Sequence, residues 1–435
     1  MPNQETTSQG FGGREKFGLI TAPIVFLVIL ILPNASGLST AGQRVLASAF
    51  FMAFLWITEA IPIAVTSLFP LVLFPFLQVE SLAKVAVNYA NSNIFLFMGG
   101  FFIAVAMQKW NLHRRIALHL ILRVGSSPRR IILGFMSATA FLSMWISNTA
   151  TTMMMYPIGL AVVLQLTERS HQGDDPEVQK AISNFRTALM LAIAYSASVG
   201  GIGTLIGTPP NIVFAAAITR LYPEAPPVSF VKWAMVGLPL VFIFIPIIWI
   251  FLTRIAFRIQ NFITAQGKDI IEEELAKLGP MQFPEKVVAW VFSLTALAWM
   301  TRGDVTIGEF KLHGWASLLH LNGFVNDAAV AILAASILFV FPVNLKKAQF
   351  ALDWQTAVKI PWGILILFGG GIALAEGFRV SGLARWIGGQ LGLIGQLPVV
   401  MMIVLICIAV VLLTEITSNT ATATLFMPIL ASVAT

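Results

Sequence analysis

Two short stretches of small polar residues interrupt otherwise apolar runs of this chain. They read Ser147-Asn148-Thr149 and Ser418-Asn419-Thr420, and each is followed by Ala and Thr and later by Pro157 or Pro428. Hydroxyl and amide groups supply oxygen ligands and hydrogen-bond donors without a fixed charge. At membrane depth such groups suit a site that holds and releases small ions. The matching order of these SNT triplets and their flanks also indicates an internal duplication.

The composition predicts that the triplets lie in a membrane. Of the 435 residues, 57% are hydrophobic and only 11% are charged, and the mean hydropathy is +0.84. Soluble domains carry about a quarter charged residues. We therefore expect an all-α polytopic membrane protein whose main partner is the lipid bilayer.

Apolar runs long enough for a crossing, about 20 residues, recur along the chain. We expect spanning helices near residues 17–33, 42–61, 64–78, 88–108, 187–220 (broken), 232–253, 286–301, 325–342 and 361–377. Two further runs, 131–164 and 398–434, carry the SNT triplets near their middles. Each arm of the first run, 131–146 or 150–164, reaches about 23 Å as a helix, which is short of the roughly 30 Å hydrocarbon core. Each run is therefore expected to form a re-entrant hairpin.

The distribution of Lys and Arg predicts the orientation. If the N-terminus and both ends of the first hairpin face the cytoplasm, most of the 27 Lys and Arg residues are cytoplasmic, as the positive-inside rule requires. Those left outside are Arg44, Lys84, Arg220, Lys232, Arg302, Lys311, Arg379 and Arg385. This asymmetry accounts for the net charge of +7, so we expect no nucleic-acid partner.

The duplication extends beyond the triplets and predicts two inverted-topology repeats. The segment 97–100 aligns with 367–370, and the two hairpins enter the membrane from opposite sides in the predicted topology. We divide the chain into an N-terminal tail and first transmembrane helix, a first repeat with hairpin 131–164, a cytoplasmic amphipathic linker, and a second repeat with hairpin 398–434. These parts span residues 1–41, 42–258, 259–285 and 286–435.

The break in each hairpin predicts its chemistry. N–H groups at the start of a helix attract anions, whereas carbonyl groups at a helix end can coordinate a cation. Ser143 and Ser147 are four residues apart, so on a continuous helix they share a face and direct two hydroxyls to one sodium ion. Thr414 and Ser418 repeat this spacing. The alternative is that these hydroxyls bond to their own helices, and the duplicated spacing favours the ion site.

A third element is rich in Gly and Pro. It runs from Ser196 through Gly200-Gly201 to Thr208-Pro209-Pro210-Asn211. Such residues break a helix, and irregular backbone is tolerated at membrane depth only where it lines a cavity or is buried by protein. We expect this element to face the first hairpin tip, where Thr208 and Pro209 would contact substrate. A simple packing kink is the alternative.

These motifs together resemble one transporter family. The two SNTAT strings, AYSASVGGIGTLIGTPPN between them and LWITEAIP at residues 55–62 are similar to the divalent anion/sodium symporter family over nearly the whole chain from residue 46. The resemblance implies two inverted repeats, each with a hairpin and a broken helix, arranged as a scaffold and an elevator-type transport domain in a homodimer. It also implies sodium-coupled transport of small dianions, C4-dicarboxylates such as succinate above all, in the inner (plasma) membrane of a bacterium.

The family pattern also assigns residues to sites. It implies that Ser147, Asn148, Gly200 and Gly201, with Ser143, hold a first sodium ion, and that Thr414, Thr417 and Asn419 hold a second. Substrate would contact Asn148, Thr149, Ser418, Asn419 and Thr420. The chain ends at Thr435, before the second broken helix and final spanning helix of the family pattern. We therefore expect the printed chain to carry an incomplete second repeat.

Other functions remain as alternatives. Two alternatives share the fold: a dicarboxylate exchanger and a sulfate carrier. A channel is a third, and it would be distinguished by a flux that does not saturate with substrate. A membrane-embedded hydrolase would use Ser147 or Ser418 as its nucleophile, although no His, Lys or Asp lies near either serine in the sequence to activate it. Acidic residues at 59, 376 and 415 are alternatives for a proton relay. The five histidines lack metal-ligand spacing and are expected to be solvated.

Overall fold

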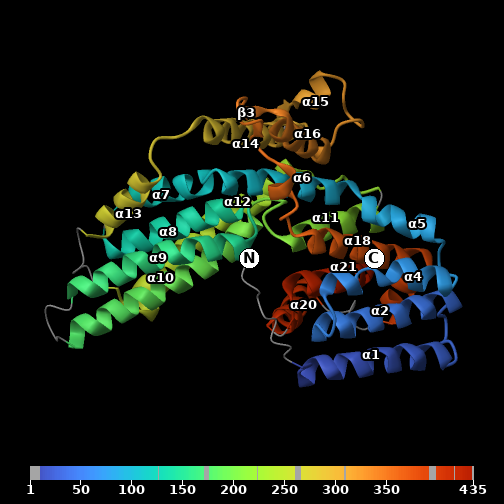
Figure 1. The fold of residues 1–435 in the computed structure, drawn as a ribbon. Helices are drawn as coiled ribbons and strands as arrows, with labels where there is room; N and C mark the ends of the chain where they lie inside the picture. The colour runs from blue at the N-terminus through green and yellow to red at the C-terminus, as the bar shows by residue number, and fades with distance from the viewer. Residues whose placement is uncertain are drawn as a thin grey trace. The chain divides into compact units, whose positions relative to one another are not determined.

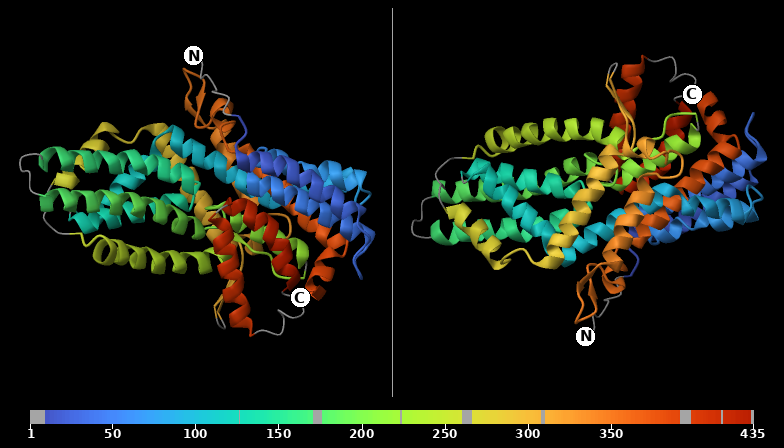
Figure 2. Two further views of the ribbon diagram at one scale, coloured as in Figure 1. Left: turned by 90° about the horizontal axis from the view of Figure 1, so that it is seen from below. Right: turned by 90° about the horizontal axis from the view of Figure 1, so that it is seen from above.

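The computed structural model describes residues 10–125, 127–170, 176–222, 224–259, 266–307, 310–390, 398–415 and 417–433. Within these residues the ordered elements are helices and two short β-hairpins (Figures 1 and 2). The chain divides into two compact units, each assembled from segments far apart in the sequence. Unit 1 comprises Met1–Ile94, Ile212–Val228 and Pro361–Thr435, and unit 2 comprises Phe95–Asn211 and Ser229–Ile360.

Unit 2 is built around the first SNT triplet. Its helices are α6 (Ser92–Lys109), α7 (Leu112–Val124), α8 (Pro128–Ser143), α9 (Asn148–Ser170), α10 (Pro176–Ile202), α12 (Phe230–Ile250), the π-helix η2 (Phe251–Ala256), α13 (Gln266–Lys277), α14 (Phe283–Thr301), α15 (Trp315–Leu318), α16 (Asp327–Val340) and α17 (Trp354–Ala357). Its strands pair as β1 (Val305–Ile307) with β2 (Phe310–Leu312) and β3 (Pro342–Asn344) with β4 (Gln349–Phe350). Helices α8, α9 and α10 lie side by side (Figure 1). Their shared core includes Phe135, Phe185 and Leu189.

Unit 1 contains the second SNT triplet. Its helices are α1 (Gly13–Ile31), α2 (Thr40–Thr58), α3 (Ile63–Thr66), α4 (Phe69–Phe76), α5 (Leu82–Val87), the 3-10 helix η1 (Asn88–Ala90), most of α11 (Pro209–Leu221), α18 (Trp362–Val380), α19 (Leu383–Gln390), α20 (Val399–Thr414) and α21 (Asn419–Val433). Trp56, Phe74 and Phe378 are fully buried in its core. Helix α2 begins where the Ser39 hydroxyl accepts a hydrogen bond from Gly42 N, a standard N-cap.

The helices confirm a polytopic membrane protein. Five of the described helical segments are long and apolar enough to cross a bilayer: Thr40–Thr58, Leu82–Lys109, Pro176–Ile202, Phe230–Ala256 and Trp362–Val380. Shorter apolar helices are Ile63–Phe76, Asn148–Leu164, Pro209–Thr219, Asp327–Val340 and Val399–Thr414. Both runs that carry SNT triplets are interrupted at the triplet, as the sequence predicts: α8 gives way to α9, and α20 to α21.

Two elements differ in length from the prediction. The span expected at 64–78 is divided into α3 and α4, because Pro70 lies in the first turn of α4, where a residue without an N–H begins a helix well. Helix α9 continues to Ser170 instead of ending near 164. Its apolar part still ends at Leu164, and the added turn consists mostly of polar residues that form helices well, such as Gln165 and Glu168.

The predicted linker contains an amphipathic helix, α13, that packs on α7 and α9. Ile271 of α13 is buried, while Glu274 pairs with Arg114 and with Lys277. These contacts, that with Lys277 above all, lower the pKa of Glu274.

The histidine prediction is wrong at one position. His113 of α7 is buried, and its Nδ1 lies 2.9 Å from the Met107 carbonyl oxygen. Burial lowers the pKa of His113, because charging a buried ring costs its hydration. His119, His313 and His320 are exposed, as expected, and His171 lies outside the described residues.

Candidate functional site

The first helix break lies between Ser143, the last residue of α8, and Asn148, the first residue of α9. The turn is tight: Ile146 N donates to the Leu142 carbonyl at 2.9 Å, and Thr151 N donates to the Ser147 carbonyl at 2.9 Å. The Ser147 hydroxyl also accepts a hydrogen bond of 3.4 Å from Ala150 N. Ser147 therefore caps the start of α9.

This geometry corrects the shared-face argument for Ser143 and Ser147. The argument needs a continuous helix, but α8 ends at Ser143 and Ser147 lies beyond its last turn. The residue that meets Ser143 is instead Asn148, across the break. Thr414 and Ser418 are separated in the same way, because α20 ends at Thr414.

Three oxygen atoms converge at Ser143. Its hydroxyl oxygen lies 2.8 Å from Asn148 Oδ1 and 2.7 Å from the Ala197 carbonyl oxygen of α10. A hydroxyl carries one hydrogen and can donate fully to one acceptor only. Asn148 Oδ1 and the Ala197 carbonyl oxygen therefore share the one proton of the Ser143 hydroxyl. Ser143 is fully buried and Asn148 is half-buried, and the cluster matches the hydroxyl, amide and carbonyl ligands that suit sodium.

The Gly-rich element packs directly against this cluster. A side chain at Gly201 would place its Cβ 2.4 Å from Asn148 Oδ1, and one at Gly200 would place its Cβ 2.3 Å from the Ala140 carbonyl oxygen. Only glycine allows α10 to approach α8 so closely, which is how small residues serve helix packing in membranes. Helix α10 then ends at Ile202 and α11 begins at Pro209. The predicted broken helix and its place beside the first hairpin tip are therefore confirmed.

Two side chains tie the broken segment to the hairpin. Asn211 donates both amide hydrogens, to the carbonyls of Gly201 at 2.9 Å and Thr204 at 2.8 Å. The Thr204 hydroxyl donates to the Met144 carbonyl in the hairpin turn. Both side chains are buried. The turn and the broken segment are thus held together by hydrogen bonds that involve no ion.

Aromatic rings hold the other side of the turn. Trp145 stacks on Trp299 with an 8° angle between planes and on Phe230 with a 22° angle, and it meets the edge of Phe292 at a centroid distance of 4.8 Å. Asp327 is hydrogen-bonded to two residues of this stack, Phe230 and Trp299, and to Arg302. It accepts from Phe230 N at 2.8 Å and Arg302 Nε at 2.5 Å, and its carbonyl accepts from Trp299 Nε1.

The anion-binding face of this tip is more open. Thr149 is exposed, and Thr208 and Pro209 are partly exposed. Pro209 and Pro210 have no N–H to offer, so donors at this end come from the first turn of α9 and from the Thr149 and Thr208 hydroxyls. The positive end of the α9 dipole adds to them.

The second break, in unit 1, offers the same residue types in a looser arrangement. The Thr414 hydroxyl donates to the Val411 carbonyl of its own helix at 2.9 Å. The Thr417 and Thr422 hydroxyl oxygens lie 2.5 Å apart, and the Thr417 hydroxyl contacts the Leu413 carbonyl oxygen at 2.8 Å. Asn419 is exposed, and Ser418 and Thr420 are half-buried. The structure therefore gathers the candidate sodium ligands at the first tip and leaves Thr414 and Asn419 apart from any such cluster among the described residues.

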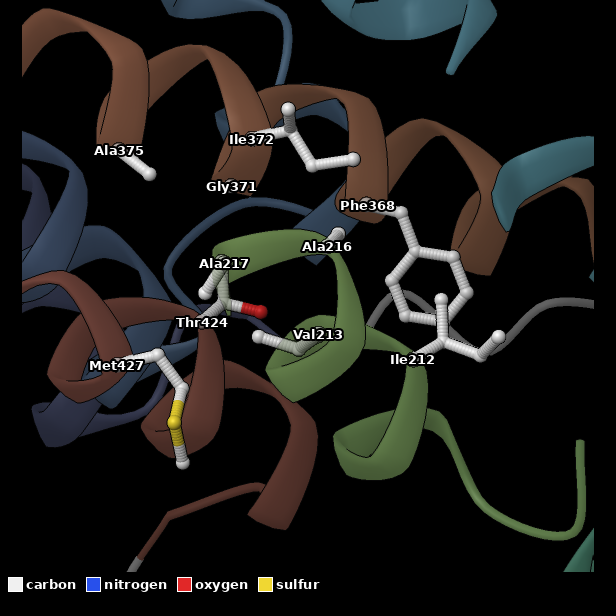
Figure 3. Close-up of a pocket in the computed structure, with 10 residues that line it drawn as sticks. All are labelled: Ile212, Val213, Ala216, Ala217, Phe368, Gly371, Ile372, Ala375, Thr424 and Met427. Atoms are coloured by element: carbon white, nitrogen blue, oxygen red, sulfur yellow. The ribbon is translucent and has the colours of Figure 1, made fainter. Parts of the chain in front are cut away.

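A hollow beneath α21 in unit 1 is not a dianion site. It is lined by α11, α18 and α21 (Figure 3), and its side chains are apolar apart from the Thr424 hydroxyl. The hydroxyl is buried without a hydrogen-bond partner among the described residues. The space available is about 10 Å³, enough for about one water molecule. A dicarboxylate would not fit there.

Residues 14–435 match the transmembrane region of the sodium:sulfate symporter family. The chain belongs to this family. It is 45% identical over 416 residues to the sodium-dependent dicarboxylate transporter SdcS of Staphylococcus saprophyticus, covering 95% of this chain and 77% of the relative. It is 43% identical over 423 residues to SdcS of Staphylococcus aureus strain bovine RF122, covering 97% and 78%.

Membership in the sodium:sulfate symporter family removes the hydrolase alternative, since the relatives are transporters and not enzymes. The three acidic residues considered for a proton relay are either paired with an arginine or exposed. Glu376 is paired with Arg379 at 2.5 Å, and Glu59 and Glu415 are exposed.

The contact that sequence reasoning missed is the Ala197 carbonyl, because a backbone oxygen has no signature in residue type.

Proposed function

We propose that this chain couples sodium to the movement of small dicarboxylates, with succinate as a representative substrate. The observation that carries the proposal is the oxygen cluster at the first hairpin tip, in which the hydroxyl oxygen of the buried Ser143 lies 2.8 Å from Asn148 Oδ1 and 2.7 Å from the Ala197 carbonyl oxygen. The names of the relatives, sodium-dependent dicarboxylate transporters, support the choice of both ligands. Sodium is cargo here and needs no redox or acid–base chemistry from the chain.

The proposed first sodium site comprises Ser143, Ser147, Asn148 and the backbone of Gly200 and Gly201. Thr414, Thr417 and Asn419 are proposed for a second ion at the other hairpin. The substrate carboxylates would bind neutral donors and helix N-termini at each tip. The donors are Asn148, Thr149 and Thr208 beside Pro209, and Ser418, Asn419 and Thr420.

Replacing sodium tests the coupling most directly. Uptake of labelled succinate into proteoliposomes is expected to require sodium and to fall to background when potassium or choline replaces it. Uptake that is unchanged without sodium would remove coupling and leave a dicarboxylate exchanger. Competition by sulfate that exceeds competition by succinate would move the substrate to sulfate.

The charge of the substrate follows from the donors. No Arg or Lys lies within either SNT run, so the carboxylates depend on hydrogen bonds, helix dipoles and bound sodium, all of which favour the fully ionised dianion. Uptake at fixed total succinate is therefore expected to decline as pH falls through the second carboxyl pKa of succinate. A rise in uptake over the same pH interval would identify the monoanion as substrate and contradict this account.

We also propose inverted repeats and an elevator motion in a homodimer, with the N-terminus in the cytoplasm. In a Cys407→Ser background, single cysteines at Lys180 and Lys346, both exposed, are expected to react only with reagent on the cytoplasmic side. A cysteine at position 311 in β2 is expected to react from outside. The background protein without an added cysteine is the control. Labelling of positions 180 and 346 from opposite faces would contradict the inverted arrangement.

A further inference from the structure

A second hollow, in unit 2, is a groove on its surface, formed by residues outside the proposed ion and substrate sites. It encloses about 400 Å³ between α7 and α14, a volume within the range of about 300–1,000 Å³ typical of small-molecule sites. Its lining residues are Leu112, Arg115, Ile116, His119, Leu120, Arg123, Phe141, Met281, Ala289, Phe292 and Ser293. The groove is thus basic along one edge and apolar over most of its remaining surface.

The basic edge comes from a single row on α7. Arg115, His119 and Arg123 are spaced four residues apart, so they lie on one face of the helix. Arg115 is already neutralised, because its Nε and Nη2 bond Glu285 at 2.6 and 3.1 Å. His119 and Arg123 are exposed, and within the described ranges no carboxylate lies at ion-pair distance from either. Positive charge in the lining therefore remains available at the exposed end of the α7 row, at Arg123 and beside His119.

The rest of the lining suits a hydrocarbon chain. Leu112, Ile116 and Leu120 line it from α7, Phe141 lines it from α8, and Phe292 lines it from α14. A soluble anion would gain nothing from such a surface, since its affinity comes from charge and hydrogen bonds alone. An amphiphile with an anionic head and an apolar chain complements both parts.

The predicted orientation places this groove at the inner leaflet. Arg115 and Arg123 belong to the Lys and Arg residues expected on the cytoplasmic side, α7 is amphipathic, and α14 coincides with an expected span. Anionic lipids at the cytoplasmic surface attract basic side chains, and basic pockets between helices bind their headgroups. We propose that the groove binds one anionic phospholipid, with its phosphate at His119 and Arg123 and one acyl chain along Ile116, Phe141 and Phe292.

The proposed lipid would touch the aromatic support of the hairpin turn. Phe141 lies 6.5 Å from Trp145 between ring centroids, and Phe292 lies 4.8 Å from it at an 85° angle. Trp145 immediately precedes Ile146 and the first SNT triplet. An acyl chain in the groove therefore packs against two rings, Phe141 and Phe292, that also contact Trp145 of this turn.

Native mass spectrometry of the delipidated full chain tests the proposal without measuring transport. Dioleoyl phosphatidylglycerol is expected to be retained about tenfold or more over dioleoyl phosphatidylcholine, since each basic group near a headgroup adds appreciably to binding. Arg123→Gln is expected to reduce this preference severalfold, and His119→Gln with Arg123→Gln to abolish it. Arg186→Gln removes an exposed arginine of α10 outside the groove and is expected to leave the preference unchanged.

A second pair of variants tests the groove itself with the charges intact. Ser293→Phe fills the groove and is expected to abolish phosphatidylglycerol retention, whereas Leu294→Phe, at the next and equally exposed position outside the lining, is expected to preserve it. Equal circular dichroism and gel-filtration behaviour establishes that each variant is folded. An unchanged lipid preference in Arg123→Gln, or full retention in Ser293→Phe, would overturn the proposal. Displacement of the lipid by an equal concentration of glycerol phosphate would also overturn it, because the site would then belong to a soluble anion.

Discussion

Replacing Asn148 with Ala is expected to lower sodium-dependent succinate uptake about 10- to 100-fold and to raise the sodium concentration needed for half-maximal uptake. Asn148 Oδ1 is one of the three oxygens at the Ser143 cluster, and a lost contact to a charged group costs about 1.5–3 kcal/mol. Substrate affinity is expected to fall as well, because Asn148 is proposed to contact both sodium and substrate, and thermodynamic linkage couples the two binding affinities. Uptake measured over a range of sodium and succinate concentrations separates the two effects.

Asn148→Asp is expected to be worse than Asn148→Ala for substrate. The added negative charge would face a dianion, and at 4 Å and an intermediate dielectric the repulsion is about 4 kcal/mol. Asn184→Ala is a matched control, because the Asn184 side chain also makes a hydrogen bond, which it donates to the Phe257 carbonyl, but lies away from the tip. Wild-type uptake and sodium dependence in Asn148→Ala and in the equivalent Asn419→Ala, at equal expression, would refute the assignment of the SNT triplets as the transport site.

Gly201→Ala is expected to abolish measurable sodium-stimulated uptake. The new Cβ would lie 2.4 Å from Asn148 Oδ1 and 3.1 Å from Asn148 Cγ, so the Asn148 side chain must rotate away from Ser143 or the helices must separate. Overpacking of this kind costs about 1–3 kcal/mol, and here the cost falls on the ion ligand itself. Initial rates with and without sodium in proteoliposomes provide the measurement.

Gly203→Ala is the matched control in the same broken segment. The two nearest contacts of its Cβ would be with the flexible side chain of Met144, at 3.0 Å from Cε and 3.1 Å from Cγ, with the Gly200 carbonyl oxygen at 3.2 Å. Met adapts readily to such crowding, and the contact with Gly200 is much longer than the 2.4 Å at Gly201. Uptake within about threefold of wild type is therefore expected, given a core cost of about 1 kcal/mol or less for adaptable neighbours. Equal losses of uptake in Gly201→Ala and Gly203→Ala would show that the whole broken segment tolerates no added volume. The loss in Gly201→Ala could then not be assigned to its contact with Asn148.

The breaks in the helices could be predicted from the sequence because their causes are local. Pro209 and the neighbouring glycines cannot continue a helix, and the SNT triplets stand out against long apolar runs. The contacts across each break could not be predicted in the same way. Ser143 meets Asn148 because the chain turns between them, whereas the spacing rule for helix faces assumes that no turn occurs.

Contacts between distant segments left no signal in the sequence. The rings at 145, 230, 292 and 299 come from two helices, α12 and α14, and one turn, and each alone resembles an ordinary apolar residue of a membrane span. The composition of the two units is equally hidden, because unit 1 combines both ends of the chain with a short central segment, and unit 2 combines the two stretches between them. The predicted repeats are defined by the order of segments along the chain, whereas the compact units are defined by which segments pack together. The predicted repeats and the observed units are therefore not expected to share boundaries.

The hairpin turn at residues 144–147 is held on two sides before any ion arrives, by the Thr204 hydrogen bond and by the rings around Trp145. Fixing the backbone of a free segment costs about 1–2 kcal/mol of conformational entropy per residue, and here that cost is met during folding. An ion that binds at Ser143 therefore encounters ligands that are already ordered. Its affinity then reflects the exchange of hydration water for protein oxygens, with little reduction from loop ordering.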